Sequence, residues 1–186
     1  GFHQSNVIGV SNDCWIMKLN SVGSIEWKKC FGGGGNDKAI SIIQTNDGGY
    51  IFIASTSSND GDVLGNHGFA DIWVVKLDNT GKPGIAPNIE WQKCLGGSSG
   101  ESASSIKQTL DGGYIILGNT LSNDGDVSGS HVKIADNEAG LSDWWVIKLD
   151  NTGFKNNAPD IEWQKCLGGS QTDVAYSIVQ AADGGY

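Results

Sequence analysis

The sequence predicts an all-β protein built from a repeated unit of four short antiparallel strands. Two observations support this prediction directly. An alternating apolar run that ends at a turn with Asn and Gly and resumes through Ile-Glu-Trp occurs three times, which is a hairpin pattern. An Asp-Gly-Gly-Tyr motif also occurs three times. A third observation is negative: nothing in the chain carries a helical period long enough for a helical repeat.

The two motifs recur with a common period. Their first residues are Asp47, Asp111 and Asp183 for one motif and Ile25, Ile89 and Ile161 for the other, so both sets are 64 and 72 residues apart. A Gly-x-His motif recurs every 64 residues and ends at His3, His67 and His131. Periods of this length are typical of propellers, solenoids or repeat arrays.

One period contains four predicted strands, at residues 102–109, 114–120, 144–149 and 161–166. The Asp-Gly-Gly turn separates the first two, because its glycines can adopt positive φ. A long polar loop, residues 122–142, precedes the third strand. Four short strands per repeat with Gly-marked turns match the blade of a β-propeller, whereas a β-helix or leucine-rich solenoid has a much shorter repeat.

This period divides the chain into four parts. Residues 1–33 hold the last two strands of one blade, residues 34–97 and 98–169 are complete blades, and residues 170–186 begin the next. A propeller closes with about four to eight blades. We therefore expect an incomplete segment of a larger propeller, or a ring completed by further copies, with exposed strand edges at both ends.

Tryptophans repeat at two places in the period, and we interpret them as packing between blades because large rings dominate core energetics. They are Trp15, Trp73, Trp145, Trp27, Trp91 and Trp163. A carbohydrate-stacking platform is the alternative. Lys18 with Glu26, Lys76 with Glu90 and Lys148 with Glu162 are predicted to form cross-strand ion pairs.

The four cysteines do not form an obvious disulfide set. Cys30, Cys94 and Cys166 occupy the same place in successive repeats, which suggests a small buried apolar residue. Cys14 has no cysteine counterpart. Pairing Lys18 with Glu26 would set Cys14 opposite Cys30, so one disulfide there is a hypothesis and the redox compartment stays open.

An acidic, histidine-bearing loop face is predicted where second strands join third strands and where blades join each other. Calcium is the candidate cofactor, because carboxylates and carbonyls on Gly-rich loops are its usual ligands. The candidate metal residues are Asn59, Asp60, Asp62, Asn123, Asp124 and Asp126. The alternative is a tight turn in which these side chains bond to nearby backbone.

Ligand binding at this face is predicted for a small set of residues: His67, His131, Trp144, Asp136 and Glu138. The longest loop, residues 132–140, breaks the repeat symmetry, and we therefore expect it to make a specialised contact. Trp144 is unique to its repeat and is either a contact between blades or an exposed patch. The histidines are expected to bond within loops, since one per blade places them too far apart to share a zinc ion.

Composition and missing motifs exclude several function classes. The net charge of −9 argues against nucleic acid as a partner. No apolar run approaches the roughly 20 residues that span a bilayer. The chain has no nucleophile elbow, P-loop or HExxH stretch, and its acidic residues repeat from blade to blade, whereas a catalytic pair should break the symmetry.

The motifs resemble two known repeat types. Val74-Val75-Lys76-Leu77-Asp78-Asn79-Thr80-Gly81 followed by Ile89-Glu90-Trp91 is similar to the tryptophan-docking repeat of quinoprotein propellers. The combination of Asp-Gly-Gly-Tyr, Ser-Asn-Asp-Gly-Asp-Val and Asp-x-Trp-Val-Val-Lys-Leu resembles repeat arrays of secreted or surface proteins of Bacteroidota-like bacteria, and this likeness covers nearly the whole chain.

The second resemblance implies a propeller and a secreted or cell-surface location. It leads us to expect a non-catalytic module that binds a glycan or a protein, or that serves as a structural scaffold. Other blades of a longer chain, or further copies, are the remaining expected partners. The alternative is a polysaccharide-active or quinoprotein-like propeller enzyme whose catalytic residues lie in other blades.

Overall fold

The computed structural model describes residues 11–131 and 141–186, and its regular secondary structure there consists of β-strands. The strands are β1 (Cys14–Leu19), β2 (Ile25–Phe31), β3 (Asp37–Gln44), β4 (Tyr50–Thr56), β5 (Asp71–Leu77), β6 (Ile89–Leu95), β7 (Glu101–Gln108), β8 (Tyr114–Thr120), β9 (Asp143–Leu149) and β10 (Ile161–Leu167). The all-β prediction is confirmed, and the four strands predicted in the last complete repeat agree with β7 to β10 to within one residue.

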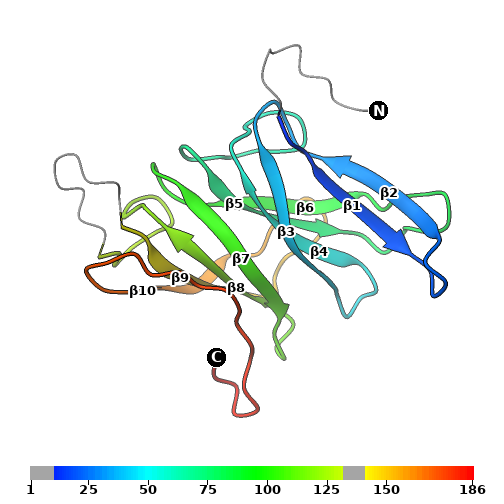
Figure 1. The fold of residues 1–186 in the computed structure, drawn as a ribbon. Helices are drawn as coiled ribbons and strands as arrows, with labels where there is room; N and C mark the ends of the chain where they lie inside the picture. Colours follow the sequence, from blue (N-terminus) through cyan, green and yellow to red (C-terminus); the bar gives the residue numbers. More distant parts are fainter. Residues whose placement is uncertain (1–10, 132–140) are drawn as a thin grey trace.

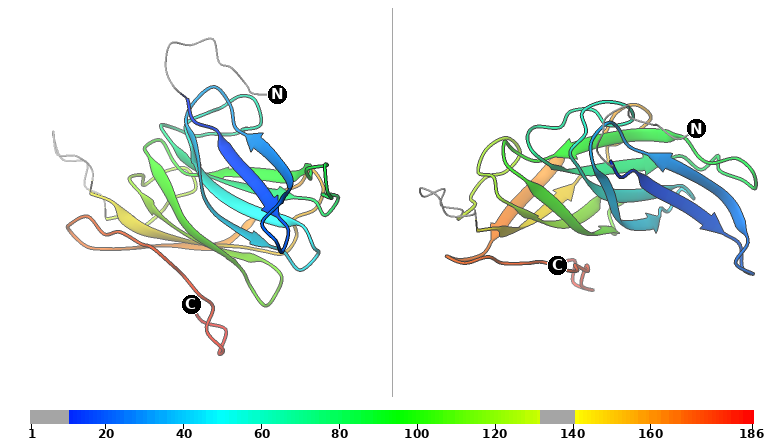
Figure 2. Two further views of the ribbon diagram at one scale, coloured as in Figure 1. Left: turned by 45° about the vertical axis from the view of Figure 1, so that its right-hand side comes forward. Right: turned by 45° about the horizontal axis from the view of Figure 1, so that its top comes forward.

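The strands form three separate antiparallel sheets in chain order, none of them closed. We call β1–β2 the N-terminal sheet, β3–β6 the middle sheet and β7–β10 the C-terminal sheet. Within each sheet, consecutive strands are neighbours, as hairpin connections require. Figure 1 and the two views of Figure 2 show the N-terminal and C-terminal sheets on opposite sides of the middle sheet.

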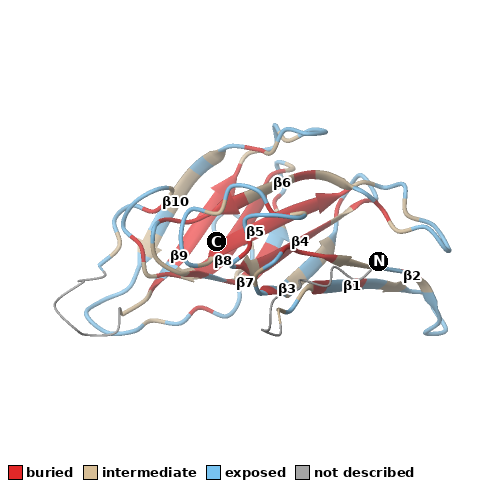
Figure 3. Cartoon of the chain, turned by 90° about the horizontal axis from the view of Figure 1, so that it is seen from above, coloured by how far each residue is buried: buried red, intermediate tan, exposed pale blue. Residues whose placement is uncertain are grey.

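The core lies between the sheets, because alternate residues of each strand point to opposite faces. On β4, Ile51 and Ile53 belong to the cluster shared with the C-terminal sheet, whereas Phe52 and Ala54 belong to the cluster shared with the N-terminal sheet. The central strands β4 and β5 are therefore buried on both faces. Figure 3 shows burial concentrated in these central strands and exposure increasing toward β1, β2 and β10.

Four of the six repeated tryptophans pack between sheets as predicted. Trp73 and Trp145 are fully buried, and Trp27 and Trp91 are nearly so. The two exceptions are on the outer sheets: 55% of Trp15 is exposed, and Trp163 is half-buried. The same motif therefore has two environments, set by whether another sheet covers it.

The three predicted cross-strand ion pairs are confirmed. Lys18, Lys76 and Lys148 each place Nζ 3.0 Å from Oε2 of the expected glutamate. In the two complete sheets the lysine also meets the aspartate of the Asp-Gly-Gly turn, at 2.8 Å for Lys76 and Asp47 and 2.9 Å for Lys148 and Asp111. This second carboxylate was not predicted from the sequence.

The suggested disulfide is wrong. Cys14 pairs with Phe31 and Trp15 pairs with Cys30, so the two cysteines are one residue out of register, and all four cysteines are free thiols. The cause is a bulge between Lys18 and Leu19, which shifts the ladder by one residue relative to the turn. Cys94 is buried, as predicted for the repeated cysteines, whereas Cys30 and Cys166 are only half-buried.

Residues 170–186, predicted to begin a further blade, lie against the C-terminal sheet without joining a strand ladder. Ala175 donates from its amide to Asn119 Oδ1 at 3.0 Å, and its side chain packs with Ile115, Leu117 and Val146. The turn at the end repeats an earlier one: Ala181 N donates to Gly185 O, as Thr45 N donates to Gly49 O. The end of the segment therefore has the same turn that follows β3 and β7.

Candidate functional site

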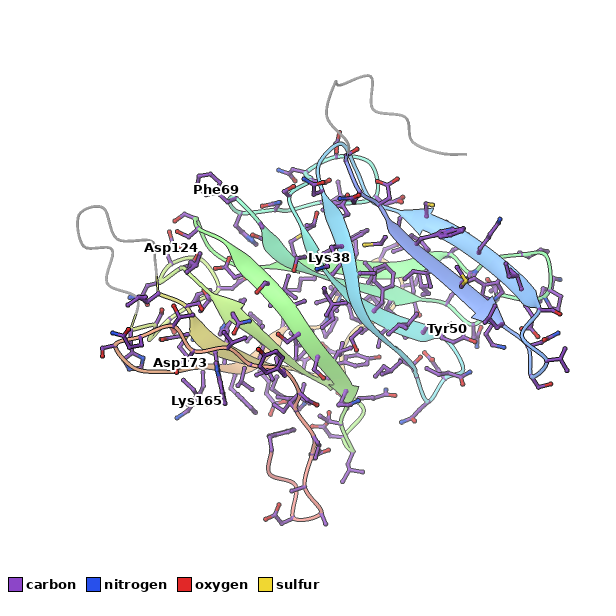
Figure 4. The ribbon with its side chains drawn as sticks, in the orientation of Figure 1. Lys38, Tyr50, Phe69, Asp124, Lys165 and Asp173 are labelled. Atoms are coloured by element: carbon purple, nitrogen blue, oxygen red, sulfur yellow. The ribbon has the colours of Figure 1, made fainter. Side chains whose placement is uncertain are left out.

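The predicted site residues gather at one end of the sheets, which we call the loop end. It carries the connections from second to third strands, of which residues 57–70, 121–131 and 141–142 are described, and the connections between sheets, residues 32–36, 96–100 and 168–172. In Figure 4, Phe69 and Asp124 mark this end, and Tyr50 lies at the other. The site calls Asp136 and Glu138 lie outside the described residues.

The loop after β4 docks onto the turn between β2 and β3. Asp60 Oδ1 accepts a hydrogen bond from Gly34 N at 2.6 Å, and Asp62 Oδ2 accepts one from Gly32 N at 3.3 Å. Asn59 Oδ1 accepts from Gly65 N at 3.1 Å and so closes its own loop. The bonds of Asp60 and Asp62 connect the middle sheet to the N-terminal sheet, because the loop follows β4 of the middle sheet and the turn follows β2 of the N-terminal sheet.

The same docking recurs one repeat later. Asp124 Oδ1 accepts from Ser98 N at 2.8 Å, Asp126 Oδ2 from Gly96 N at 3.3 Å, and Asn123 Oδ1 from Ser130 N at 3.2 Å. The bonds from Ser98 lower the pKa of Asp124. At both copies, the candidate metal residues fix loops to backbone amides.

No group of three or more His, Cys, Asp or Glu that could hold a metal ion occurs in residues 11–131 and 141–186. The hydrogen bonds of the candidate metal residues to loop backbone agree with the loop-fixing interpretation. Calcium binding by these loops stays a prediction.

His67 and His131 each pair with an aspartate that begins a third strand. His67 Nδ1 lies 2.7 Å from Asp71 Oδ2 and His131 Nδ1 lies 2.9 Å from Asp143 Oδ2, and each histidine also donates its backbone amide to the same oxygen. Both aspartates are buried while about half of each imidazole is exposed. The histidines thus bond within their own repeats, as expected, and leave one ring edge toward solvent.

Two carboxylates converge at the junction between the middle and C-terminal sheets. Asp71 Oδ1 and Glu101 Oε2 both lie within 2.6 Å of the point where a Cβ on Gly96 would stand, so only glycine fits there. The pKa of Asp71 is raised, mainly because the carboxylate is buried. The negative charge of Glu101 also raises this pKa, whereas hydrogen bonds from His67 lower it. Asp71 Oδ1 is a buried side-chain oxygen without a hydrogen-bond partner.

We expect Asp71→Asn to raise the free energy of unfolding at neutral pH by about 1 kcal/mol. An unsatisfied buried polar group costs about 1–3 kcal/mol, and an amide would donate to Glu101 while its oxygen still accepts from His67. Because the pKa of Asp71 is raised in the folded state, the wild type gains stability as pH falls through that pKa, so the difference should shrink in acid.

Urea unfolding of both proteins across pH 4–7 measures this. The control is Asp78→Asn. Asp78 is half-buried, and although burial acts to raise its pKa, hydrogen bonds from Thr80 and Asn88 lower it, so the amide should not stabilise the protein. A large loss of stability in Asp71→Asn would contradict the prediction and show that Oδ1 makes a favourable contact.

An open hollow of about 490 Å³ lies at the loop end of the C-terminal sheet. Its polar lining includes Glu101, Ser102, Asn119 and Ser142, and Val174 from the C-terminal segment forms part of the wall. Residues 170–186 border the hollow, where Asp173 N donates to Ser142 O at 2.8 Å. Hydroxyl, amide and carboxylate groups thus face one recess.

Trp144 stands next to this hollow on the same sheet face. It pairs directly with Asn119 across β8 and β9, and residues opposite each other in an antiparallel ladder point to the same side. Its side chain is 40% exposed, whereas Trp145, on the other face, is fully buried. Ile72, at the same place in the previous repeat, is fully buried against the next sheet, so both interpretations of Trp144 stay open.

The structure brings together only some of the predicted ligand residues. Trp144 adjoins the hollow. His131 is bonded to Asp143, the residue just before Trp144 in β9. His67 is bonded to Asp71 at the junction between the middle and C-terminal sheets, one repeat away. Sequence reasoning missed Asn119 and Ser102, because their only signal is that they replace Ser55 and Lys38 of the previous repeat.

Comparison with protein-family models found no matching family, and comparison with curated proteins found no match. Within the described ranges, no helix is long and apolar enough to cross a membrane.

Proposed function

We propose that the chain is part of a β-propeller that acts as a non-catalytic binding module, with a glycan bound at the hollow beside Trp144. The propeller part is supported by two four-stranded antiparallel sheets with the same strand order, stacked face to face in chain order. The secreted or cell-surface location belongs to this proposal and is supported by the resemblance of the repeat.

The observation that carries the binding proposal is an exposed aromatic ring beside a recess of polar groups. Trp144 offers an apolar face with a polar edge, and Asn119, Ser102 and Ser142 offer donors and acceptors within the recess. A sugar ring has the complementary chemistry, with an apolar C–H face and hydroxyls at its edge. Glu101 lines the recess but is buried, and its carboxylate already accepts hydrogen bonds from Thr120 Oγ1 at 2.8 Å and from Gly97 N at 2.9 Å.

A glycan array followed by calorimetry with the best hit tests this proposal. Trp144→Ala should weaken binding about two- to tenfold, which corresponds to the 0.5–1.5 kcal/mol of an aromatic contact. Trp15→Ala is the matched control, because it removes another exposed tryptophan from the opposite outer sheet and should leave affinity unchanged.

Binding that is unaffected by Trp144→Ala and by Asn119→Ala would reject this site. The absence of any glycan ligand, together with capture of a protein through the same residues, would replace the glycan by a protein partner.

A further inference from the structure

A pocket of about 230 Å³ lies between the middle and C-terminal sheets, and we call it the junction pocket. It is at the end of the sheets opposite the loop end, where the turns after β3 and β7 and the loops after β5 and β9 are found. Tyr50 marks this end in Figure 4. The pocket is formed by two four-stranded sheets, so it belongs to the repeated architecture itself.

Hydrogen bonds across the junction hold the walls of this pocket in place. Asn46 N, in the turn after β3, donates to Gln108 Oε1 of β7 at 2.9 Å. Asn156 N, in the loop after β9, donates to Glu90 O of β6 at 2.8 Å. Because Asn46, Gln108 and Glu90 all line the pocket, contacts between the two sheets fix its shape.

Two buried side chains present unpaired polar groups to the junction pocket. Trp91 and Tyr114 line it, and only 4% and 6% of their surfaces are exposed. Trp91 Nε1 and Tyr114 Oη have no hydrogen-bond partner among the described residues. By contrast, Trp73 and Trp145 each donate from Nε1 to a glutamine. Since a buried indole N–H or phenol usually has a partner, the partner here must come from inside the pocket.

The charged groups of the junction pocket have a negative balance. Asp47, Glu90 and Asp150 contribute three carboxylates, against one ammonium from Lys76. Lys76 Nζ lies 2.8 Å from Asp47 Oδ2 and 3.0 Å from Glu90 Oε2, so its charge is already engaged. The negative balance disfavours an anionic ligand, and the polar lining disfavours an apolar one.

The lining therefore divides into donors and acceptors. Burial raises the pKa of Tyr114, and the charges of Asp47 and Glu90 raise it further, so the hydroxyl stays protonated at neutral pH and donates. Trp91 Nε1 is a donor as well, whereas the carboxylates are acceptors. A ligand for this pocket must both accept and donate hydrogen bonds.

We propose that the junction pocket binds a single sugar ring through the hydroxyl groups of the ring. A sugar hydroxyl accepts a hydrogen bond from one group and donates to another, so a ring with several hydroxyls satisfies Trp91, Tyr114 and the carboxylates together. The volume of about 230 Å³ suits one ring. A second pocket of about 310 Å³ shares Asp47 and Glu90 with it and has room for a substituent on that ring.

This site is separate from the hollow beside Trp144, which lies at the loop end. The two sites share no lining residue. Trp144→Ala should therefore leave binding in the junction pocket unchanged, so that either site can fail without the other.

The test follows the indole N–H resonance of Trp91 in the whole chain by two-dimensional NMR. Methyl glycosides of glucose, galactose, mannose and N-acetylglucosamine are added one at a time, and the spectrum of Trp91→Phe assigns the resonance by its loss. We expect at least one glycoside to shift the resonance saturably with a Kd of about 1 mM, as for a small ligand with few contacts.

Tyr114→Phe should weaken this binding about two- to tenfold, the range for one lost hydrogen bond. Because the hydroxyl has no partner among the described residues, we expect unfolding in urea to match the wild type. The matched control is Tyr176→Phe, which removes the hydroxyl of a tyrosine that is 82% exposed and should leave the affinity unchanged.

Three results would overturn the proposal. If no glycoside shifts the Trp91 resonance even at high millimolar concentration, solvent fills the pocket. If tetramethylammonium chloride shifts the resonance and the glycosides do not, the carboxylates select a cation instead of a sugar. If Tyr114→Phe binds the glycoside as tightly as the wild type, the sugar is held elsewhere.

Discussion

Trp73→Ala is expected to lower the free energy of unfolding by about 3–5 kcal/mol, the range for removing a large aromatic ring from a core. Trp73 is fully buried, its ring centroid is 5.8 Å from that of Phe52, and its Nε1 donates to Gln92 Oε1 at 2.7 Å. The substitution would leave a cavity between the N-terminal and middle sheets. It would also leave Gln92 Oε1 without the hydrogen bond that Trp73 donates. Urea unfolding at low protein concentration measures the loss.

The repeat supplies its own control, Trp15→Ala. Trp15 stands at the same place in its hairpin but is 55% exposed, with the ammonium of Lys28 5.6 Å from its ring. Removing an exposed side chain usually changes stability by no more than about 0.5 kcal/mol. Equal losses for the two variants would contradict the prediction and would mean that Trp15 is covered in solution.

Lys148→Met is the second substitution with a large expected effect, a loss of about 1–2 kcal/mol, between the values for exposed and buried ion pairs, because the lysine is buried while both carboxylates are about half exposed. Only 3% of the Lys148 side chain is exposed, and its Nζ contacts Asp111, Glu162 and the carbonyl of Leu149. Although burial opposes its charge, bonds to the two carboxylates raise its pKa. Methionine would fill the volume but leave both carboxylates without their cation.

This variant also carries a pH signature. Hydrogen bonds from Thr109 and then from Lys148 lower the pKa of Asp111 from 3.8 to about 2. A lowered pKa gives stability that is present above 3.8 and lost as pH falls toward 2. We expect the wild type to lose stability over this window and Lys148→Met to lose less, as measured by urea midpoints from pH 6 to 2.

Lys18→Met controls for the generic effect of removing a lysine. Lys18 has the same glutamate contact at 3.0 Å, but 36% of its side chain is exposed. A partly exposed pair contributes about 0–1 kcal/mol, so the change should be small at every pH. A similar loss in both lysine variants would assign the effect to the shared glutamate contact instead of the aspartate of the turn.

The candidate site could be predicted only in part. The loop residues were identified because Ser-Asn-Asp-Gly-Asp repeats, and their side chains do accept backbone bonds, as in the turn interpretation. The hollow beside Trp144 could not be read from the sequence, because it forms where residues 170–186 meet β8 and β9. Likewise, the approach of Asp71 and Glu101 to the same point beside Gly96 joins two sheets and has no local pattern.

The sequence by itself determined the strands, their turns and the ion pairs within each hairpin. These features depend on alternation along a strand and on neighbours a few residues away, so Lys18 and Glu26 could be paired correctly. Only the tertiary structure decided the register at Cys14, because one bulged residue moves every later partner. It also decided that Trp73 is buried and Trp15 exposed, since identical motifs differ only in whether a second sheet packs against them.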